Sequence, residues 1–248
     1  MTVCNILGTN VNVGNVDDVL GEIEINLEKI KGNYICVSNV HTTIMAYEDS
    51  YYRSIQNEAF MVLPDGRPLS ILSKIRGHKN AERITGPDIF DKILKNSEKK
   101  GFTHYFYGST QNTLDKLKDK LMYQYPNLNI IGTFSPPFRV LTADEDREIV
   151  ETINKINPDF LWLGLGAPKQ EIWMYEHKNI INSIMVGVGA AFDYHAGNIK
   201  RAPKFMQNLG LEWVFRLIQE PRRLWRRYFH SNSKFLFLIF KEILSKIS

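Results

Sequence analysis

Cysteine is scarce in this 248-residue chain, which contains only Cys4 and Cys36. Two cysteines cannot form a disulfide framework, and no group of Cys and His residues has metal-ligand spacing. The N-terminus lacks the basic and apolar regions of a secretory signal, and no apolar run approaches the roughly 20 residues that a membrane-spanning helix needs. These absences predict a reducing environment and a soluble or peripheral protein on the cytoplasmic side.

Two common nucleotide-binding signatures are also missing. The segment GLGAPKQE (Gly164–Glu171) lacks the Gly-Lys-Ser/Thr of a P-loop, and neither it nor GVGAAF (Gly187–Phe192) has the third glycine of the dinucleotide fingerprint. This argues against a nicotinamide-dependent oxidoreductase. The sequence has no internal repeat and no nucleic-acid motif, so we do not expect nucleic-acid binding.

The excess of positive charge is confined to the C-terminal region. The formal net charge is +4, and residues 213–248 hold eight Lys and Arg against two acids. Basic and aromatic side chains alternate there at helical spacing, which suits anionic headgroups or a diphosphate together with a membrane interface. An amphipathic helix that packs on the body, with solvated arginines, fits the pattern equally well. The apolar run Phe235–Phe240 is likewise a core helix or an interfacial one.

Short β-branched or aromatic runs alternate with helical periodicity along the chain. This pattern predicts an α/β fold with a mostly parallel sheet flanked by helices. Asn198–Pro203 is the only clear boundary, and it divides a catalytic body (1–200) from a helical, basic appendage (201–248). We expect strands at Tyr34–Ser38, Phe60–Leu63, His104–Tyr107, Asn129–Thr133, Phe160–Gly164 and Ser183–Val188, and helices that begin near Val16, Thr43, Pro68, Pro87, Gln111, Asp144, Lys169 and Lys204.

Residues just after the predicted strands are the candidate site residues, because ligands of open α/β sheets lie beyond the carboxyl ends of the strands. Asp65 follows an apolar strand in a Pro-Asp-Gly turn, where burial would raise its pKa to suit a general base. The same tripeptide is also common as a simple turn. Asn39 could contact a sugar or orient Asp65, or it could only cap the next helix. Further candidates for substrate contact are Gly108, Lys169, Gln170, Glu171, Gly189 and Asp193.

Two other features have ordinary structural explanations. Asp144-Glu145-Asp146 matches the D-x-D pattern that holds a metal in many sugar-nucleotide enzymes. Because it begins an amphipathic helix, where acids complement the helix dipole, we expect a solvated helix start and no metal site. For His41 we expect an ordinary hydrogen-bonded loop histidine.

Seven segments together resemble the WecG/TagA/CpsF family, glycosyltransferase family 26, from about Asn5 to Tyr228. The resemblance implies a Rossmann-like body with an appendage that closes the active site at the inner face of the membrane. It implies an inverting transferase that needs no metal or other cofactor. This enzyme would move an N-acetylmannosamine-type sugar or another hexose from a UDP-sugar to an undecaprenyl-diphosphate-linked sugar, in polysaccharide, capsule or teichoic acid synthesis. The segments are NVHT (Asn39–Thr42), LPDG (Leu63–Gly66), TGPD (Thr85–Asp88), GLGAPKQE (Gly164–Glu171), GVGAAFDYHAG (Gly187–Gly197), KRAP (Lys200–Pro203) and GLEWVFRLIQEPRRLWRRY (Gly210–Tyr228).

The resemblance also implies roles for single residues. Asp65 matches the family's proposed base, Asn39 its sugar-contacting asparagine and Asp193 its uridine-side acid. Gln170 lies in the nucleotide-contacting turn. The arginines thought to hold the diphosphate match Arg216, Arg223 and Arg226, of which we expect Arg223 to act in catalysis.

Two departures leave the substrates open. Val37 stands where many members have Thr, and PDGRPLS (Pro64–Ser70) differs from the PDGMGV type of several members. The alternative from another functional class is a non-catalytic nucleotide-binding or lipid-adaptor module. A homo-oligomer is compatible with the sequence.

Overall fold

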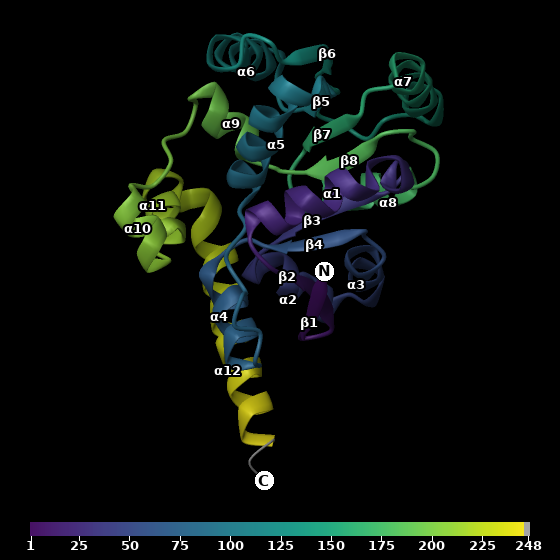
Figure 1. Ribbon diagram of the computed structural model, residues 1–248. Helices are drawn as coiled ribbons and strands as arrows, with labels where there is room; N and C mark the ends of the chain where they lie inside the picture. Colours follow the sequence, from purple (N-terminus) through teal and green to yellow (C-terminus); the bar gives the residue numbers. More distant parts are fainter. Residues whose placement is uncertain (246–248) are drawn as a thin grey trace.

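The centre of the computed structural model, which describes residues 1–245, is a six-stranded sheet in which every neighbouring pair is parallel. The strand order is β4-β3-β8-β7-β5-β6 (Figure 1). The predicted α/β class and all six predicted strands are confirmed, with ends that differ by at most one residue. The strands are β3 (Tyr34–Ser38), β4 (Met61–Pro64), β5 (Thr103–Gly108), β6 (Asn129–Phe134), β7 (Phe160–Gly164) and β8 (Ile184–Gly187).

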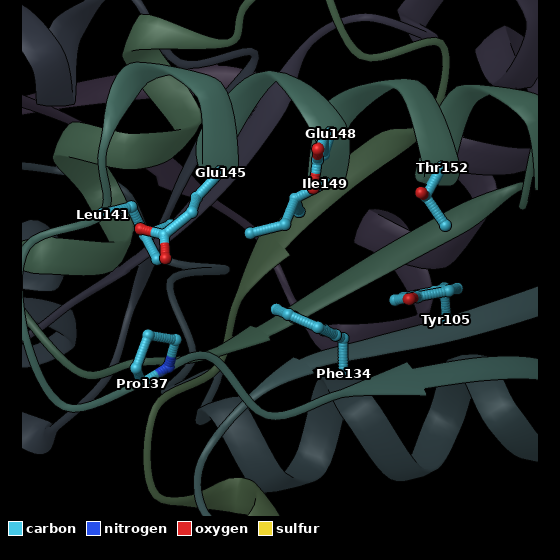
Figure 2. Close-up of a pocket in the computed structure, with 8 residues that line it drawn as sticks. All are labelled: Tyr105, Phe134, Pro137, Leu141, Glu145, Glu148, Ile149 and Thr152. Carbon is cyan, nitrogen blue, oxygen red and sulfur yellow. The ribbon is translucent and has the colours of Figure 1, made fainter.

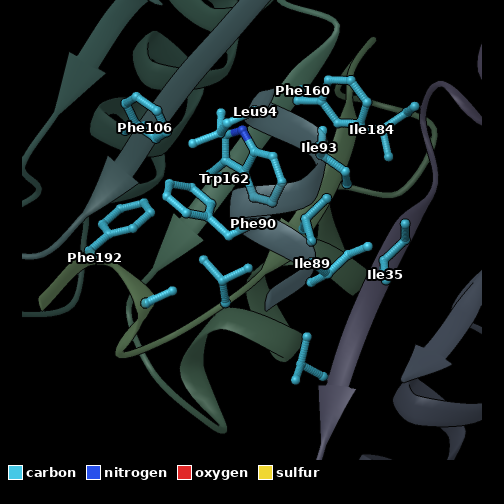
Figure 3. Close-up of a cluster of buried hydrophobic side chains, with 14 of the residues drawn as sticks. Ile35, Ile89, Phe90, Ile93, Leu94, Phe106, Phe160, Trp162, Ile184 and Phe192 are labelled. Carbon is cyan, nitrogen blue, oxygen red and sulfur yellow. The ribbon is translucent and has the colours of Figure 1, made fainter. Parts of the chain in front are cut away.

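Side chains alternate between the two faces of the sheet, and each face has its own apolar core. In β7, Phe160 and Trp162 point into one core and Leu161 and Leu163 into the other. The first core is shown in Figure 3, where Phe90 packs edge-on to Trp162 at 4.7 Å between ring centres. It is covered by α1 (Val16–Ile30), α5 (Gly86–Lys100), α6 (Gln111–Gln124) and α9 (Ala191–Ala196), and the second by α2 (Val40–Glu48), α3 (Ser50–Asn57), α7 (Ala143–Ile156) and α8 (Lys169–Glu176).

An N-terminal hairpin covers part of the second face, and our sequence analysis did not predict it. Strands β1 (Thr2–Ile6) and β2 (Thr9–Val13) pair antiparallel and bury Ile6 and Val11 completely. Asn12 joins the hairpin to the sheet, because its side-chain oxygen accepts a 2.7 Å hydrogen bond from the backbone of Val62. The short, polar sequence of β2 hides the alternation that would have identified a strand.

The described part of the C-terminal region, residues 204–245, forms three helices, where we expected one tail helix from about Lys204. These are α10 (Lys204–Leu209), α11 (Glu212–Gln219) and α12 (Pro221–Ser245). The breaks have local causes, since Gly210 takes a left-handed conformation with φ of 76° and Pro221 cannot continue a preceding helix. Asn198–Pro203, the predicted boundary, contains no helix or strand.

Helix α12 runs along the body and then beyond it, with α4 (Arg67–Ile75) close by (Figure 1). Two ion pairs fix its course. Lys234 lies 2.5 Å from Glu48 of α2, and Arg76, directly after α4, lies 2.6 Å from Glu242. Buried Leu224 and Phe235 supply the apolar contacts on the same side of the helix. The appendage is therefore held against the body at several points.

Candidate active site

A cleft of about 470 Å³ opens at the carboxyl ends of β4, β3, β8 and β7. These strands are adjacent in the sheet, and the register places Ser38 opposite Pro64 and Leu163 opposite Gly187. The turns that follow the strands therefore meet at one edge. Helices α11 and α12 form the opposite wall with Glu212, Arg216, Arg223 and Arg227.

Asp65 lies directly after β4 at the floor of this cleft. Its backbone N–H donates to Ser38 O at 2.7 Å, and Gly66, at φ of 112°, turns the chain into α4. Burial raises the pKa of Asp65 to about 7, and the negative charge of Glu212 adds to the effect. The nearby guanidinium of Arg83 opposes the shift. Such a carboxylate is half ionised near neutral pH, where a general base works best.

Asn39 caps α2, which was one of the two roles that the sequence allowed for it. Its side-chain oxygen accepts hydrogen bonds from the backbone N–H groups of His41 at 3.0 Å and Thr42 at 3.2 Å. The residue also lines the cleft beside Asp65. The cap fixes its orientation, so a sugar contact and a capping role are compatible.

His41, which we expected in a loop, lies in the first turn of α2 and joins that helix to the appendage. Its Nδ1 lies 2.9 Å from the hydroxyl of Ser231 on α12. Burial, followed by the positive charge of Arg227, lowers the pKa of His41 to about 4. The ring is therefore neutral at physiological pH and adds no charge to the cleft.

Gln170 joins two glycine turns at the back of the cleft. Its side-chain oxygen accepts 3.1 Å hydrogen bonds from the N–H groups of Gly166 and Gly189, and its amide nitrogen donates to Glu171 at 2.8 Å. Both glycines have positive φ, at 79° and 52°, which other residues adopt only with strain. Glu171 is fully buried, and burial raises its pKa to about 7. Gln170 and Glu171 therefore set the shape of the turns.

Helices α11 and α12 of the appendage meet at a bend, Glu220-Pro221, which we call the elbow. Arginines of both helices lie close to it. One carboxylate oxygen of Glu220 lies 3.3 Å from Arg216 of α11 and 2.6 Å from Arg223 of α12. Arg216 also lies over the ring of Tyr194, 5.6 Å from its centre. The elbow thus brings cations from two helices to one side of the cleft.

A second set of charged side chains links the body, the boundary segment Asn198–Pro203 and the appendage. Glu212 of α11 lies 2.8 Å from Arg83 and 3.5 Å from Arg201, which in turn lies 2.7 Å from Asp88. Asp88, Arg201 and Glu212 come from the TGPD, KRAP and GLEW segments. Sequence reasoning gave them no role and missed Arg83 altogether, because opposite charges this far apart in sequence give no local signal.

The structure brings most of the predicted site residues to the cleft and leaves three outside its lining. Asp193 lines the cleft and accepts a 3.1 Å hydrogen bond from Asn198. Gly108 packs on the backbone of Gly164, which leaves no room for a Cβ atom. Lys169 is exposed at the start of α8, and Arg226 is exposed and stacks over Trp225. Arg227, which sequence reasoning did not choose, lines the cleft instead.

The D-x-D segment begins α7 as expected, although only part of it is solvated. Glu145 forms a capping box with Thr142, and Asp144 pairs with Arg147 at 2.5 Å. Asp146 is partly buried, and it accepts a hydrogen bond from the indole of Trp173 at 3.0 Å and contacts His177 at 2.8 Å. Within residues 1–245 no group of three or more His, Cys, Asp or Glu side chains could hold a metal ion.

A smaller cavity of about 200 Å³ lies away from the cleft, between α7 and the sheet edge at β6 (Figure 2). Its walls are mainly apolar, with Tyr105, Phe134 and Ile149 among them. None of the predicted site residues lines it. We therefore place the candidate active site in the larger cleft.

Comparison with known proteins identifies the family of this chain. The family model described as "Glycosyl transferase WecG/TagA/CpsF family" matches residues 4–248. This chain belongs to that family. Two relatives bear the name N-acetylglucosaminyldiphosphoundecaprenol N-acetyl-beta-D-mannosaminyltransferase. The Bacillus subtilis strain 168 protein is 31% identical over 99% of this chain and 93% of its own length, and the Bacillus spizizenii protein is 30% identical over 81% and 76%.

The exposed surface of the appendage is rich in large apolar side chains. On α12, Trp225 is 52% exposed, Phe229 74% and Phe240 62%, whereas Phe235 is buried. The Phe235–Phe240 run is thus partly core and partly surface. In the part of the chain that the structure describes, no helix is long and apolar enough to cross a membrane.

Proposed function

We propose that this protein is an inverting transferase acting on a UDP-sugar and an undecaprenyl-diphosphate-linked sugar. The donor sugar would be N-acetylmannosamine or a related hexose, and the product would feed cell-wall or surface polysaccharide synthesis. The observation that carries the proposal is that Asp65 and the appendage arginines line the same cleft. The family and the names of the two relatives support it.

In this mechanism Asp65 accepts the proton of the acceptor hydroxyl while that oxygen attacks the anomeric carbon. The glycosidic bond to UDP breaks on the opposite face of the sugar, through an oxocarbenium-like transition state. The leaving diphosphate develops negative charge, which Arg216 and Arg223 are placed to stabilise. Asn39 would contact the sugar, and Asp193 with the Gln170 turn would contact the uridine side.

We also propose peripheral association with the inner face of the cell membrane through α12. The support is the exposed aromatic surface of that helix next to its arginines, which combines the two kinds of side chain found at membrane interfaces. The full chain should therefore sediment with vesicles of anionic phospholipid at physiological salt. A protein that stays in the supernatant would contradict this part of the proposal.

The direct test is transfer by the purified full chain. UDP-N-acetylmannosamine, UDP-N-acetylglucosamine and UDP-glucose would each be mixed with a short-chain polyprenyl-diphosphate N-acetylglucosamine, with and without chelator, and products identified by mass. We expect transfer from one donor, unchanged by chelator. Absence of transfer from every donor, with UDP still bound, would favour the adaptor alternative.

A further inference from the structure

The cleft contains several cations that already face an acid. Glu212 lies 2.8 Å from Arg83, and Glu220 bridges Arg216 and Arg223. Each of these guanidinium groups therefore has part of its charge neutralised within the protein. A negatively charged ligand would share these donors with a carboxylate that already orients them.

Arg227 differs from the other arginines of the appendage that line the cleft. It is half-buried on α12. Its Nε, like that of Arg216, is buried without a hydrogen-bond partner, but Arg216 also forms an ion pair with Glu220. Among the described residues no carboxylate lies within ion-pair distance of it, and its guanidinium lies over the ring of Tyr228, 5.4 Å from the ring centre. The pKa of neighbouring His41 is lowered to about 4, mainly by burial, so its ring is neutral. A partly buried guanidinium without an anion is unfavourable unless a ligand completes the site.

Arg226 has the opposite environment although it is the adjacent residue. One residue along an α-helix is a rotation of about 100°, so the two side chains leave α12 in different directions. Arg226 is exposed, lies over Trp225 at 5.4 Å and does not line the cleft. Leu224 and Ser231 are buried against the body and fix the rotation of α12 about its axis. This rotation determines which of the two arginines faces the cleft.

We infer that Arg227 binds a diphosphate group in the cleft, in the place that the family resemblance gives to Arg226. The planar guanidinium offers paired N–H donors that match phosphate oxygens, and partial burial strengthens the contact. The inference rests on the proposed function for the source of the ligand. The diphosphate could belong to the UDP donor or to the lipid-linked acceptor, and the two sources can be separated by experiment.

The test compares Arg227→Gln, Arg227→Lys and Arg226→Gln in the full chain. Calorimetric titration with UDP and with inorganic pyrophosphate would be followed by the KM of the short-chain acceptor. Loss of a charge-assisted contact predicts that Arg227→Gln weakens binding by about 10- to 100-fold, with a smaller loss for Arg227→Lys. Arg226→Gln should change it by less than about threefold, because an exposed cation away from the ligand contributes little.

Weaker UDP binding by Arg227→Gln assigns the contact to the donor. Unchanged UDP binding with an acceptor KM raised at least about tenfold assigns it to the acceptor. If Arg227→Gln has no larger effect than Arg226→Gln on both ligands, the inference is wrong. Should Arg227→Gln fail to fold, Arg227→Lys against Arg226→Gln makes the same comparison. If the wild-type protein transfers no sugar, the proposed function fails, while pyrophosphate titration still decides the role of Arg227.

Discussion

Replacing Asp65 by Asn should abolish transfer and stabilise the fold at the same time. Burial and Glu212 raise the pKa of Asp65 from 3.8 to about 7, so the folded state resists ionisation of this carboxyl. Asn has the shape of the protonated acid and never ionises. The two proteins should therefore be equally stable well below pH 3.8, where Asp65 is protonated in both folded and unfolded chains.

The difference should grow between pH 4 and pH 7. In this window the unfolded chain loses the Asp65 proton and the folded chain keeps it, so wild-type stability falls by up to about 1.4 kcal/mol for each pH unit. Above pH 7 both states are ionised and the difference is constant. Because Asp65 is only half-buried, solvent screening reduces the sum, and we expect about 1–3 kcal/mol at pH 8. For a chain of this size that is a rise in Tm of several degrees.

Activity should change in the other direction. Loss of a general base lowers the rate by about 10²- to 10⁴-fold, while UDP binding should stay within about threefold. In the wild type, kcat/KM should fall about tenfold per pH unit below pH 7, as Asp65 becomes protonated. The measurements are thermal unfolding from pH 4 to 8, UDP titration and initial rates, with exposed Asp119→Asn as the surface control.

Two results would refute this reasoning. An Asp65→Asn protein that still transfers sugar at the wild-type rate would remove Asp65 from catalysis. A variant that is inactive but no more stable than wild type at pH 8 would show that the carboxyl is not held in an environment that opposes its ionisation.

The other predictions concern the residues that support the site. Glu220→Gln should lower kcat/KM by about tenfold, because Arg216 and Arg223 lose the charge that holds them together. As a control, Glu242→Gln breaks an ion pair at the far end of α12 and should leave initial rates unchanged. Gln170→Ala leaves the N–H groups of Gly166 and Gly189 without their partner, so Tm and UDP affinity should both fall in thermal-shift titrations, and unchanged values would contradict the role given to Gln170. Glu212→Gln should move the pH dependence of initial rates to lower pH, since Glu212 helps to raise the pKa of Asp65; a profile that stays in place would exclude this coupling.

The sheet and one edge of the site could be predicted from sequence because both follow from strand patterns. Apolar runs located the six parallel strands, and the rule that ligands lie at their carboxyl ends located Asn39, Asp65 and Gly189. The same rule also selected Gly108, whose position on β5 serves backbone packing against Gly164. A position directly after a strand thus indicates that a residue lies near the site. Whether that residue lines the cleft or only packs against its neighbours depends on the tertiary packing.

The appendage could not be predicted at this level. The choice between Arg226 and Arg227 depends on the rotation of α12, which is set by buried Leu224 and Ser231 and by the break at Pro221. Arg83 was missed because it lies in a segment without regular structure and its partner Glu212 is far away in sequence. Tertiary contacts of this kind have no periodic signature.

The negative charge of Glu212 links the position of the appendage to the pKa of Asp65. With α11 in place, Glu212 holds Arg83 and Arg201 and at the same time raises the pKa of the carboxyl at the cleft floor. Moving α11 away would remove this negative charge and admit water, and both changes lower the pKa of Asp65 and weaken it as a base. It would also remove Arg216 from the leaving group. In the proposed mechanism, proton acceptance and leaving-group stabilisation therefore depend on the same docked helix, so a donor bound without the appendage in place would lack both.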